Sequence, residues 1–561
     1  MPTARRLGAV AGALQPRHAA AAAREERLLT DDQVRRFIAE GVLALPVTDL
    51  PQELHRLIHS KGEALNDGGE NPGDGIFDAV PELSELLAAP SVGGALTSLL
   101  GEGWSMASHR HMHTNIPAGG ADQSLHKDSQ RTKPSLHRPR SLFIFYVPRG
   151  ATAQMGATAV VPGSPYVSVD SQDWSVANES PANLGPGLYK TKLTAPLDQG
   201  TIVLAHHGII HGATARLEDD KGHPWRPMFK FIFGRRIDPT APSWDHQADV
   251  PLTPWEELTT EPSLIPGMES TWNWLCGAQP DGPVAADASG DDRDRWAATL
   301  GAEAAPGDEA ARVGAAYQLG RAANQSDEAA LAVLIHGLGS EVEGCRRASV
   351  HGLQAAGDCA VPELMRVLEE TEDHEMLMNA SDALGEAAAS PSAAVVEALD
   401  RVLIKLDGLI SSSVTMRAWA SGEAKREQHM LDADTAATAA VLALAHIGLR
   451  AVAAHDVALC ESILAVLLPY MRVTGPVRDY PADSHYHGFN HSGVHSAAVL
   501  AAAALCPLPA MANTQLRTAL EVESMGEVGD SSRPHTHKRL SNATHTAAAA
   551  LKVRTGCSSA Y

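Results

Sequence analysis

A histidine and an aspartate stand two residues apart in the stretch LHKDSQ, as His126 and Asp128. Residues i and i+2 of an extended segment point to the same side, so this imidazole and carboxylate can share one cation. Such a pair occurs often by chance, and a metal site therefore needs a third ligand from a later strand. The apolar stretch GTIVLAHHGIIHG offers His206, His207 and His211.

We favour His211 as the third ligand. It ends an apolar run and is followed by a glycine, so that a metal can approach closely. His207 shares this face only if the strand twists, and it ranks lower together with His206. Two histidines and one carboxylate form the facial triad of non-haem iron(II) oxygenases, whereas a structural zinc site is closed and usually richer in cysteine. The sequence predicts an iron(II) site.

Enzymes with this triad commonly use 2-oxoglutarate, whose distal carboxylate needs a buried cation. Arginine suits this role, because its planar fork matches a carboxylate with two hydrogen bonds. Arg226 lies in HPWRPMFKFIFGRR, at the start of the strand expected after His211, whereas Arg216 lies in the polar turn TARLEDDKG. Groups on strands hold their position better than groups on loops, so Arg226 is the predicted anchor.

Other histidines cluster without an accompanying carboxylate. HRHMH places His109, His111 and His113 on one face of a strand. We interpret them as a polar wall of the cavity, with His113 in contact with the co-substrate or substrate, in preference to a second metal site. The stretches DSHYHGFNHSGVH and RPHTH are interpreted as solvated loops between repeats, on a face that binds partners, with metal binding as the alternative.

The elements that position these residues change in character along the chain. Eight of nine tryptophans and seven of eight phenylalanines precede residue 300, after which Ala, Leu, Gly and Glu dominate. Aromatic and β-branched residues suit strands, while Ala and Leu suit helices. This predicts a strand-rich first half and a helical second half, joined by a polar linker that begins with CGAQPDGPVAADASGDDRDR.

In the first half, Thr30 is predicted to cap a helix that Gly41 ends, and Pro51 to begin a second helix. Five strand-like runs follow, separated by Gly and Pro, which indicates a barrel or jelly roll. The runs are WSMASHRHMHTNI, SLFIFYVP, GATAVVPGS, GTIVLAHHGIIHG and PMFKFIFGR.

The second half contains related segments, RVGAAYQLG, RRASVHGLQ and NASDALGEA, which begin at Arg312, Arg346 and Asn379. A helical period in the low thirties, with small residues and Leu on the packing face, indicates stacked helix pairs similar to HEAT repeats. An irregular helical bundle is the alternative.

Bulk properties exclude some classes of function. The formal net charge of −22 argues against nucleic acid as the main partner. No run of 18 apolar residues is present, so no membrane span is expected. Six cysteines without a CxxC pair suit reduced thiols in a cytoplasmic protein. The arginine- and alanine-rich first residues form either a tail or an organelle transit peptide.

The order of LTDDQVRRFIAEGVLALP, LHKDSQ, GATAVVPGSPY, IIHGATA and WRPMFKFIFGRR resembles the phytanoyl-CoA dioxygenase family of iron(II)/2-oxoglutarate oxygenases. The resemblance covers Leu28 to Arg236. It implies a double-stranded β-helix, iron held by His126, Asp128 and His211, and 2-oxoglutarate held by an arginine at the position of Arg226. Ascorbate is expected to support activity.

This chain departs from the family pattern at three places. Lys127 stands where glutamine is common, Pro165 replaces the histidine of PGSH, and the turn before Arg226 is longer than usual. Alternation turns Lys127 away from the metal, so the triad is kept. Halogenating relatives replace the carboxylate ligand with a small residue, and the presence of Asp128 therefore favours hydroxylation.

Together these patterns predict a multidomain α+β protein. The expected parts are a tail (1–27), a jelly-roll oxygenase domain (28–275), a linker (276–306) and a HEAT-like repeat domain (307–561). The predicted activity is oxidation of a small organic substrate by O2 and 2-oxoglutarate, with release of succinate and CO2. The alternatives are a non-catalytic repeat scaffold with a vestigial barrel, or oxidation of a protein partner held by the repeats. Fold alone does not identify the substrate.

Overall fold

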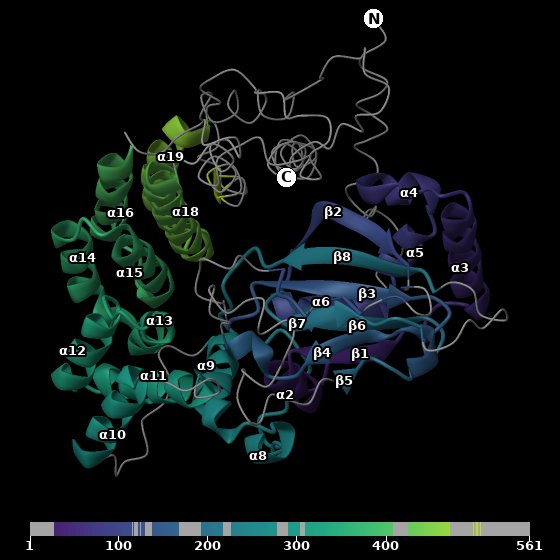
Figure 1. The fold of residues 1–561 in the computed structure, drawn as a ribbon, viewed down its shortest axis with the longest axis horizontal. Coiled ribbons are helices and arrows are strands. Elements are labelled where there is room, and N and C mark those ends of the chain that lie inside the picture. Colours follow the sequence, from purple (N-terminus) through teal and green to yellow (C-terminus); the bar gives the residue numbers. More distant parts are fainter. Residues whose placement is uncertain are drawn as a thin grey trace, which may run out of the picture.

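The computed structural model describes residues 27–114, 116, 120, 122–123, 125–128, 137–167, 192–216, 226–277, 290–302, 309–407, 424–471, 498, 501–502 and 505. A strand-rich part is followed by a helical part, and the two lie side by side (Figure 1). Nearly all of the predicted tail and both later histidine-rich stretches fall outside the described residues.

Two antiparallel sheets form the strand-rich part, one of five strands in the order β1-β6-β3-β8-β2 and one of three in the order β5-β4-β7. Alternate residues of β3 serve two cores. Leu142, Ile144 and Tyr146 join the core shared with the helices, while Phe143 and Phe145 face the second sheet. The strands are β1 (Val42–Pro46), β2 (Ser105–His113), β3 (Ser141–Val147), β4 (Thr158–Val161), β5 (Lys192–Leu193), β6 (Thr201–His206), β7 (Ile210–Ala213) and β8 (Met228–Gly234).

Helices cover the outer face of the five-stranded sheet. Thr30 caps the first of them by accepting a hydrogen bond from the Gln33 amide, and Gly41 ends it with a φ of 75°, as predicted. Pro51 precedes the second, also as predicted. The helices of this part are α2 (Asp31–Glu40), α3 (Gln52–Asp67), α4 (Ile76–Ala79), α5 (Leu83–Leu87), α6 (Pro90–Leu100), α8 (Trp255–Leu258) and α9 (Ile265–Leu275).

One predicted strand is wrong in its extent. The run GTIVLAHHGIIHG forms two strands, β6 in the larger sheet and β7 in the smaller one. The chain turns between them at His207 and Gly208, where the Gly208 amide donates to Nδ1 of the buried His206 at 3.0 Å. His211 therefore lies inside β7, on the second sheet, and does not end a single strand.

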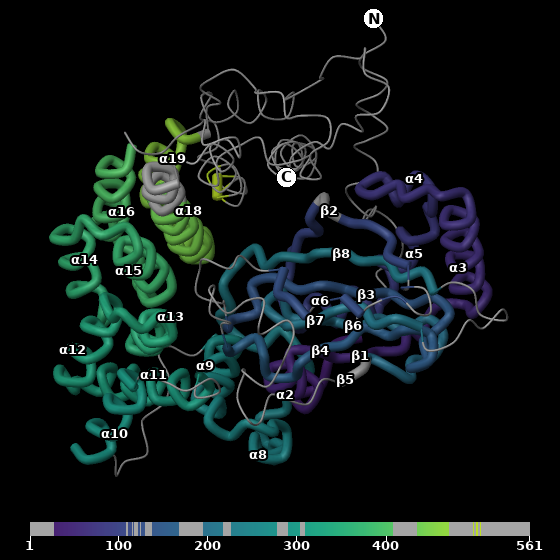
Figure 2. The backbone as a smooth tube through the Cα atoms, in the orientation of Figure 1, coloured from purple at the N-terminus to yellow at the C-terminus, as the bar shows by residue number. Residues whose placement is uncertain are grey.

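The helical part is a succession of paired helices. Helices α11, α13, α15 and α18 contact one another in that order, and α12, α14 and α16 each contact the next helix of this series (Figure 2). Helix α10 lies inside the segment predicted as a linker. The bounds are α10 (Gly290–Gly301), α11 (Glu309–Asn324), α12 (Glu328–Gly337), α13 (Glu343–Ala356), α14 (Val361–Glu370), α15 (His374–Ala387), α16 (Ala393–Leu406), α18 (Ala424–Ala453) and α19 (Val457–Leu467).

Within α18, the segment Thr435–Ala453 is long and apolar enough to cross a membrane by length and composition, with a mean hydropathy of 1.7. Its most apolar window is 72% buried inside the protein, and the core helix of a folded domain passes the same test.

Buried ion pairs join the two parts. From the strand-rich part, Arg138 and Arg140 donate to the carboxylate of Glu386 on α15 at 2.7–3.1 Å. Arg450 on α18 in turn donates to Asp238 at 3.0 Å. Each of these charges has an opposite partner, as burial of charged groups requires. The same apolar core also extends across the boundary.

Candidate metal centre

His126 is held opposite His211 by the main chain. The amide of each residue donates to the carbonyl of the other at 2.9 Å, which makes a hydrogen-bonded antiparallel pair. Their imidazole rings lie on the same side with centroids 4.6 Å apart. The segment that carries His126 thus adds to the edge of the smaller sheet beside β7.

Asp128 completes a cluster with these two histidines. Its Oδ1 lies 3.5 Å from His126 Nε2 and its Oδ2 lies 3.8 Å from His211 Nε2. One ligand atom from each residue can be chosen so that all lie within 4.8 Å of one another, and no other such group was found among the described residues. Neighbouring donors around a metal with bonds near 2 Å lie about 3 Å apart. The three residues therefore fit one small cation.

The chemistry of His211 also suits a metal ligand. Its Nδ1 bonds the carbonyl of Ile209 at 3.2 Å, so the proton lies on Nδ1 and the Nε2 lone pair faces Asp128. Burial lowers the pKa of His211 to about 4, which keeps the ring neutral near pH 7. A metal binds the neutral form of histidine.

Asp128 stays ionised in this setting. Burial alone raises its pKa, but the hydrogen bond from His126 and the charge of Lys230 outweigh burial and hold the pKa well below its usual value. A carboxylate that is ionised at every ordinary pH is the form that a metal needs.

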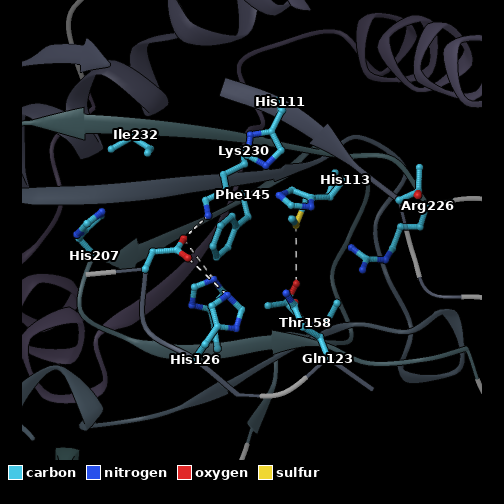
Figure 3. Close-up of a pocket in the computed structure, with 15 residues that line it drawn as sticks. His111, His113, Gln123, His126, Phe145, Thr158, His207, Arg226, Lys230 and Ile232 are labelled. Atoms are coloured by element: carbon cyan, nitrogen blue, oxygen red, sulfur yellow. Dashed lines mark hydrogen bonds and ion pairs between the residues drawn. The ribbon is translucent and has the colours of Figure 1, made fainter. Parts of the chain in front are cut away.

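The cluster opens into a cavity of about 440 Å³ between the two sheets (Figure 3). Strands β2, β3 and β8 form one wall, and β4 and β7 form the other. The lining residues are His111, His113, Thr114, Gln123, His126, Asp128, Phe145, Thr158, His207, His211, Ala213, Arg226, Met228, Lys230 and Ile232.

Arg226 is in this cavity, just before β8. It is 4% exposed, and its Nη2 donates to the carbonyl of Gly156 at 2.6 Å. Burial lowers its pKa to about 10, so the guanidinium stays charged near pH 7. Arg216, the alternative anchor, is not among the described lining residues.

The remaining predicted histidines divide between the cavity and the core. His111 and His113 line the cavity with ring centroids 4.2 Å apart, while the side chain of His109 is outside the described set. His207 also lines it, although the sequence ranked it low. His206 points away and is 5% exposed.

Sequence reasoning missed Lys230. Its ammonium forms an ion pair with Asp128 and lies 4.3 Å from the centroid of the Phe143 ring. The signal was present in RPMFKFIF, where alternation places Lys230 on the same face as Arg226.

Lys127 faces away from the cluster, as alternation predicts. Its ammonium donates to the carbonyls of Ser164, at 2.7 Å, and Val167. Burial lowers its pKa to about 7. The lysine between the two ligands therefore belongs to the core and leaves the ligand face open.

Comparison with known proteins gives partial structural matches. No family model and no curated protein matches the chain. Among solved structures, the non-haem α-ketoglutarate-dependent carbocyclase SnoK from nogalamycin biosynthesis is 17% identical, with a TM-score of 0.29 over 37% of this chain and 85% of that one. HygX from Streptomyces hygroscopicus, with nickel and 2-oxoglutarate bound, is 13% identical, with a TM-score of 0.30 over 37% and 87%. The epimerase SnoN, in complex with Fe3+ and α-ketoglutarate, is 16% identical, with a TM-score of 0.27 over 36% and 83%.

Proposed function

We propose that this protein is an iron(II)- and 2-oxoglutarate-dependent dioxygenase that hydroxylates, or otherwise oxidises, a small organic substrate. The observation that carries the proposal is the convergence of His126, Asp128 and His211 in one cavity with the buried cation of Arg226. In the hydroxylation, one atom of O2 enters a C–H bond of the substrate. The other enters succinate as 2-oxoglutarate loses CO2.

The residues of the chain would divide the work as follows. His126, Asp128 and His211 would hold the metal, and the cavity beside them would take the co-substrate, O2 and the substrate. Bound iron(II) supplies the activation of O2, and the protein supplies orientation and shielding. Arg226 receives the distal carboxylate of 2-oxoglutarate in two hydrogen bonds.

The same proposal covers the architecture. We assign the strand-rich part, residues 28–275, to a double-stranded β-helix of the phytanoyl-CoA dioxygenase type. The motif order and the pair of antiparallel sheets support this assignment. We assign residues 307–561 to HEAT-like repeats, because the described helices follow one another as stacked pairs.

Succinate release tests the activity. Purified protein with iron(II), 2-oxoglutarate and ascorbate should release succinate slowly even without substrate. His126→Ala should abolish this release together with iron binding, because a ligand is lost. The matched control is His336→Ala, which changes an exposed histidine on α12. Equal release by wild type and His126→Ala, with no iron bound by either, would contradict the proposal and favour the scaffold alternative.

A further inference from the structure

Lys230 places a second cation in the cavity, apart from Arg226. Lys230 lies in β8 and Arg226 lies just before that strand. Both side chains line the cavity, with Met228 between them. Extended chain rises about 3.3 Å per residue, so their Cα atoms are about 13 Å apart. Figure 3 shows Arg226 and Lys230 at separate places along the cavity. One small dianion that is held by Arg226 and the metal does not need Lys230 as well.

The pairing of β8 with its neighbouring strands shows which side chains lie next to Lys230 and which lie nearer to Arg226. His113 pairs with Met228 on the adjacent strand, and His111 pairs with Lys230. On the other side, Phe145 pairs with Lys230. The Arg226 end of the cavity is therefore lined by polar groups, and the Lys230 end has an aromatic wall.

Apolar side chains surround Lys230 in addition to its polar neighbours Asp128 and His111. Phe145 and Ile232 line the cavity beside it, and Phe143 lies beneath its ammonium. His207 is a further polar neighbour, and burial lowers its pKa to about 4, so this ring is neutral near pH 7. The region combines one positive charge with an apolar wall, which suits an anionic head on a carbon skeleton.

The charges of the described lining residues leave room for one more anion. With histidines counted as neutral, the described lining residues carry the positive charges of Arg226 and Lys230 and the negative charge of Asp128. A divalent metal adds two positive charges and 2-oxoglutarate adds two negative ones. Among these groups one positive charge is then uncompensated, and unpaired charge in a buried site is costly.

We propose that Lys230 is a specificity-determining residue that binds a carboxylate of the substrate, so that the enzyme acts on apolar monocarboxylic acids. This inference rests on the proposed dioxygenase function. A monoanion satisfies the remaining charge, whereas a phosphate dianion would exceed it. Metal binding would draw on the negative charge of Asp128, so that the Lys230 ammonium can pair with the substrate.

The test is binding of matched acids and amides to full-length protein loaded with manganese(II) and 2-oxoglutarate. The probes run from acetate and acetamide to decanoate and decanamide, with affinities measured by calorimetry and ligand-observed NMR. Wild type should bind at least one acid more than 10-fold tighter than its amide. Lys230→Met should bring this ratio close to one, while Lys230→Arg and the distant Lys61→Met should keep it.

The outcomes separate this inference from the proposed function. If wild type fails to bind manganese(II) and 2-oxoglutarate, both the proposed function and the inference fall. If both bind but no pair shows an acid preference, or Lys230→Met keeps the preference, only the inference is overturned. It is also overturned if Lys230→Met loses metal or 2-oxoglutarate affinity and leaves the acid preference intact. Lys230 would then only position Asp128 or anchor the co-substrate.

Discussion

Arg226 is buried and charged, and its Nη2 donates a hydrogen bond to the carbonyl of Gly156. If it anchors 2-oxoglutarate, Arg226→Met should weaken 2-oxoglutarate binding by about 10- to 100-fold, because a charge-assisted pair in a desolvated site is lost. Metal affinity without 2-oxoglutarate should stay unchanged. Calorimetric titration of the manganese(II)-loaded protein measures both quantities.

The control for this prediction is Arg216→Met, which removes the rival arginine. It should leave 2-oxoglutarate affinity within a factor of about two, since Arg216 is not among the described lining residues. A large loss in Arg216→Met with none in Arg226→Met would reverse the assignment.

Sequence reasoning singled out His126, Asp128, His211 and Arg226 by residue type and spacing, and the structure brings the four side chains to one cavity. Their convergence depends on non-local pairing of the His126 segment with β7, which spacing alone does not reveal. Lys230 could have been found by extending the alternation from Arg226, but a lysine has many ordinary surface roles.

Gly156 precedes β4 and accepts a hydrogen bond from Arg226 through its carbonyl. Its φ of +75° lies in the left-handed region that favours glycine. A Cβ at this position would lie 2.5 Å from the carbonyl oxygen of Thr214. Gly156→Ala should therefore destabilise the protein by about 1–3 kcal/mol and also weaken 2-oxoglutarate binding. Thermal unfolding and calorimetric titration measure the two effects.

Gly73→Ala is the matched control, since Gly73 has a φ of +55° with no atom within 4 Å of the added Cβ. It shares the backbone strain and lacks the collision, so it should cost less stability and leave 2-oxoglutarate binding unchanged. Equal effects of the two substitutions would show that the close approach at Gly156 is unimportant.

Strands were the most predictable elements. Runs such as SLFIFYVP and PMFKFIFGR are rich in aromatic residues and are bounded by turn residues, and both form strands where expected. The division of GTIVLAHHGIIHG between two sheets was not predictable from its apolar pattern. It depends on β6 pairing with β1 and β3, and β7 with β4, which are contacts distant in sequence.

Two buried histidines meet where the strand-rich and helical parts of the molecule join. His137 stacks on His351 of α13 with ring centroids 3.5 Å apart, and its Nδ1 bonds the Tyr317 hydroxyl at 2.8 Å. Burial lowers the pKa of His351 to about 3 and holds that of His137 well below its usual value. Both rings are therefore neutral in the folded protein near pH 7.

This burial predicts a loss of stability in weak acid. A histidine in the unfolded chain has a pKa near 6.5, so it becomes protonated below that pH. In the folded protein His351 stays neutral until about pH 3. Acid therefore stabilises the unfolded chain relative to the folded protein. As the pH falls through this window, each such histidine lowers the free energy of unfolding by about 1.4 kcal/mol per pH unit. His351→Leu should reduce the slope of unfolding free energy against pH, because roughly one fewer proton is then taken up on unfolding.

Chemical denaturation between pH 7.5 and 5 measures this dependence, with His336→Leu at an exposed position as the control. The control should keep the wild-type slope. An unchanged slope in His351→Leu would mean that His351 is not held neutral by the junction.

We propose that His126, Asp128 and His211 hold an iron ion whose co-substrate reaches Arg226. Anomalous diffraction at the iron edge, from crystals grown without oxygen in iron(II) and 2-oxoglutarate, tests it most directly. The predicted result is one iron peak bonded to His126 Nε2, the Asp128 carboxylate and His211 Nε2, with the distal carboxylate of 2-oxoglutarate on the Arg226 guanidinium. An iron peak elsewhere, such as between His111 and His113, or no peak in the cavity, would contradict it.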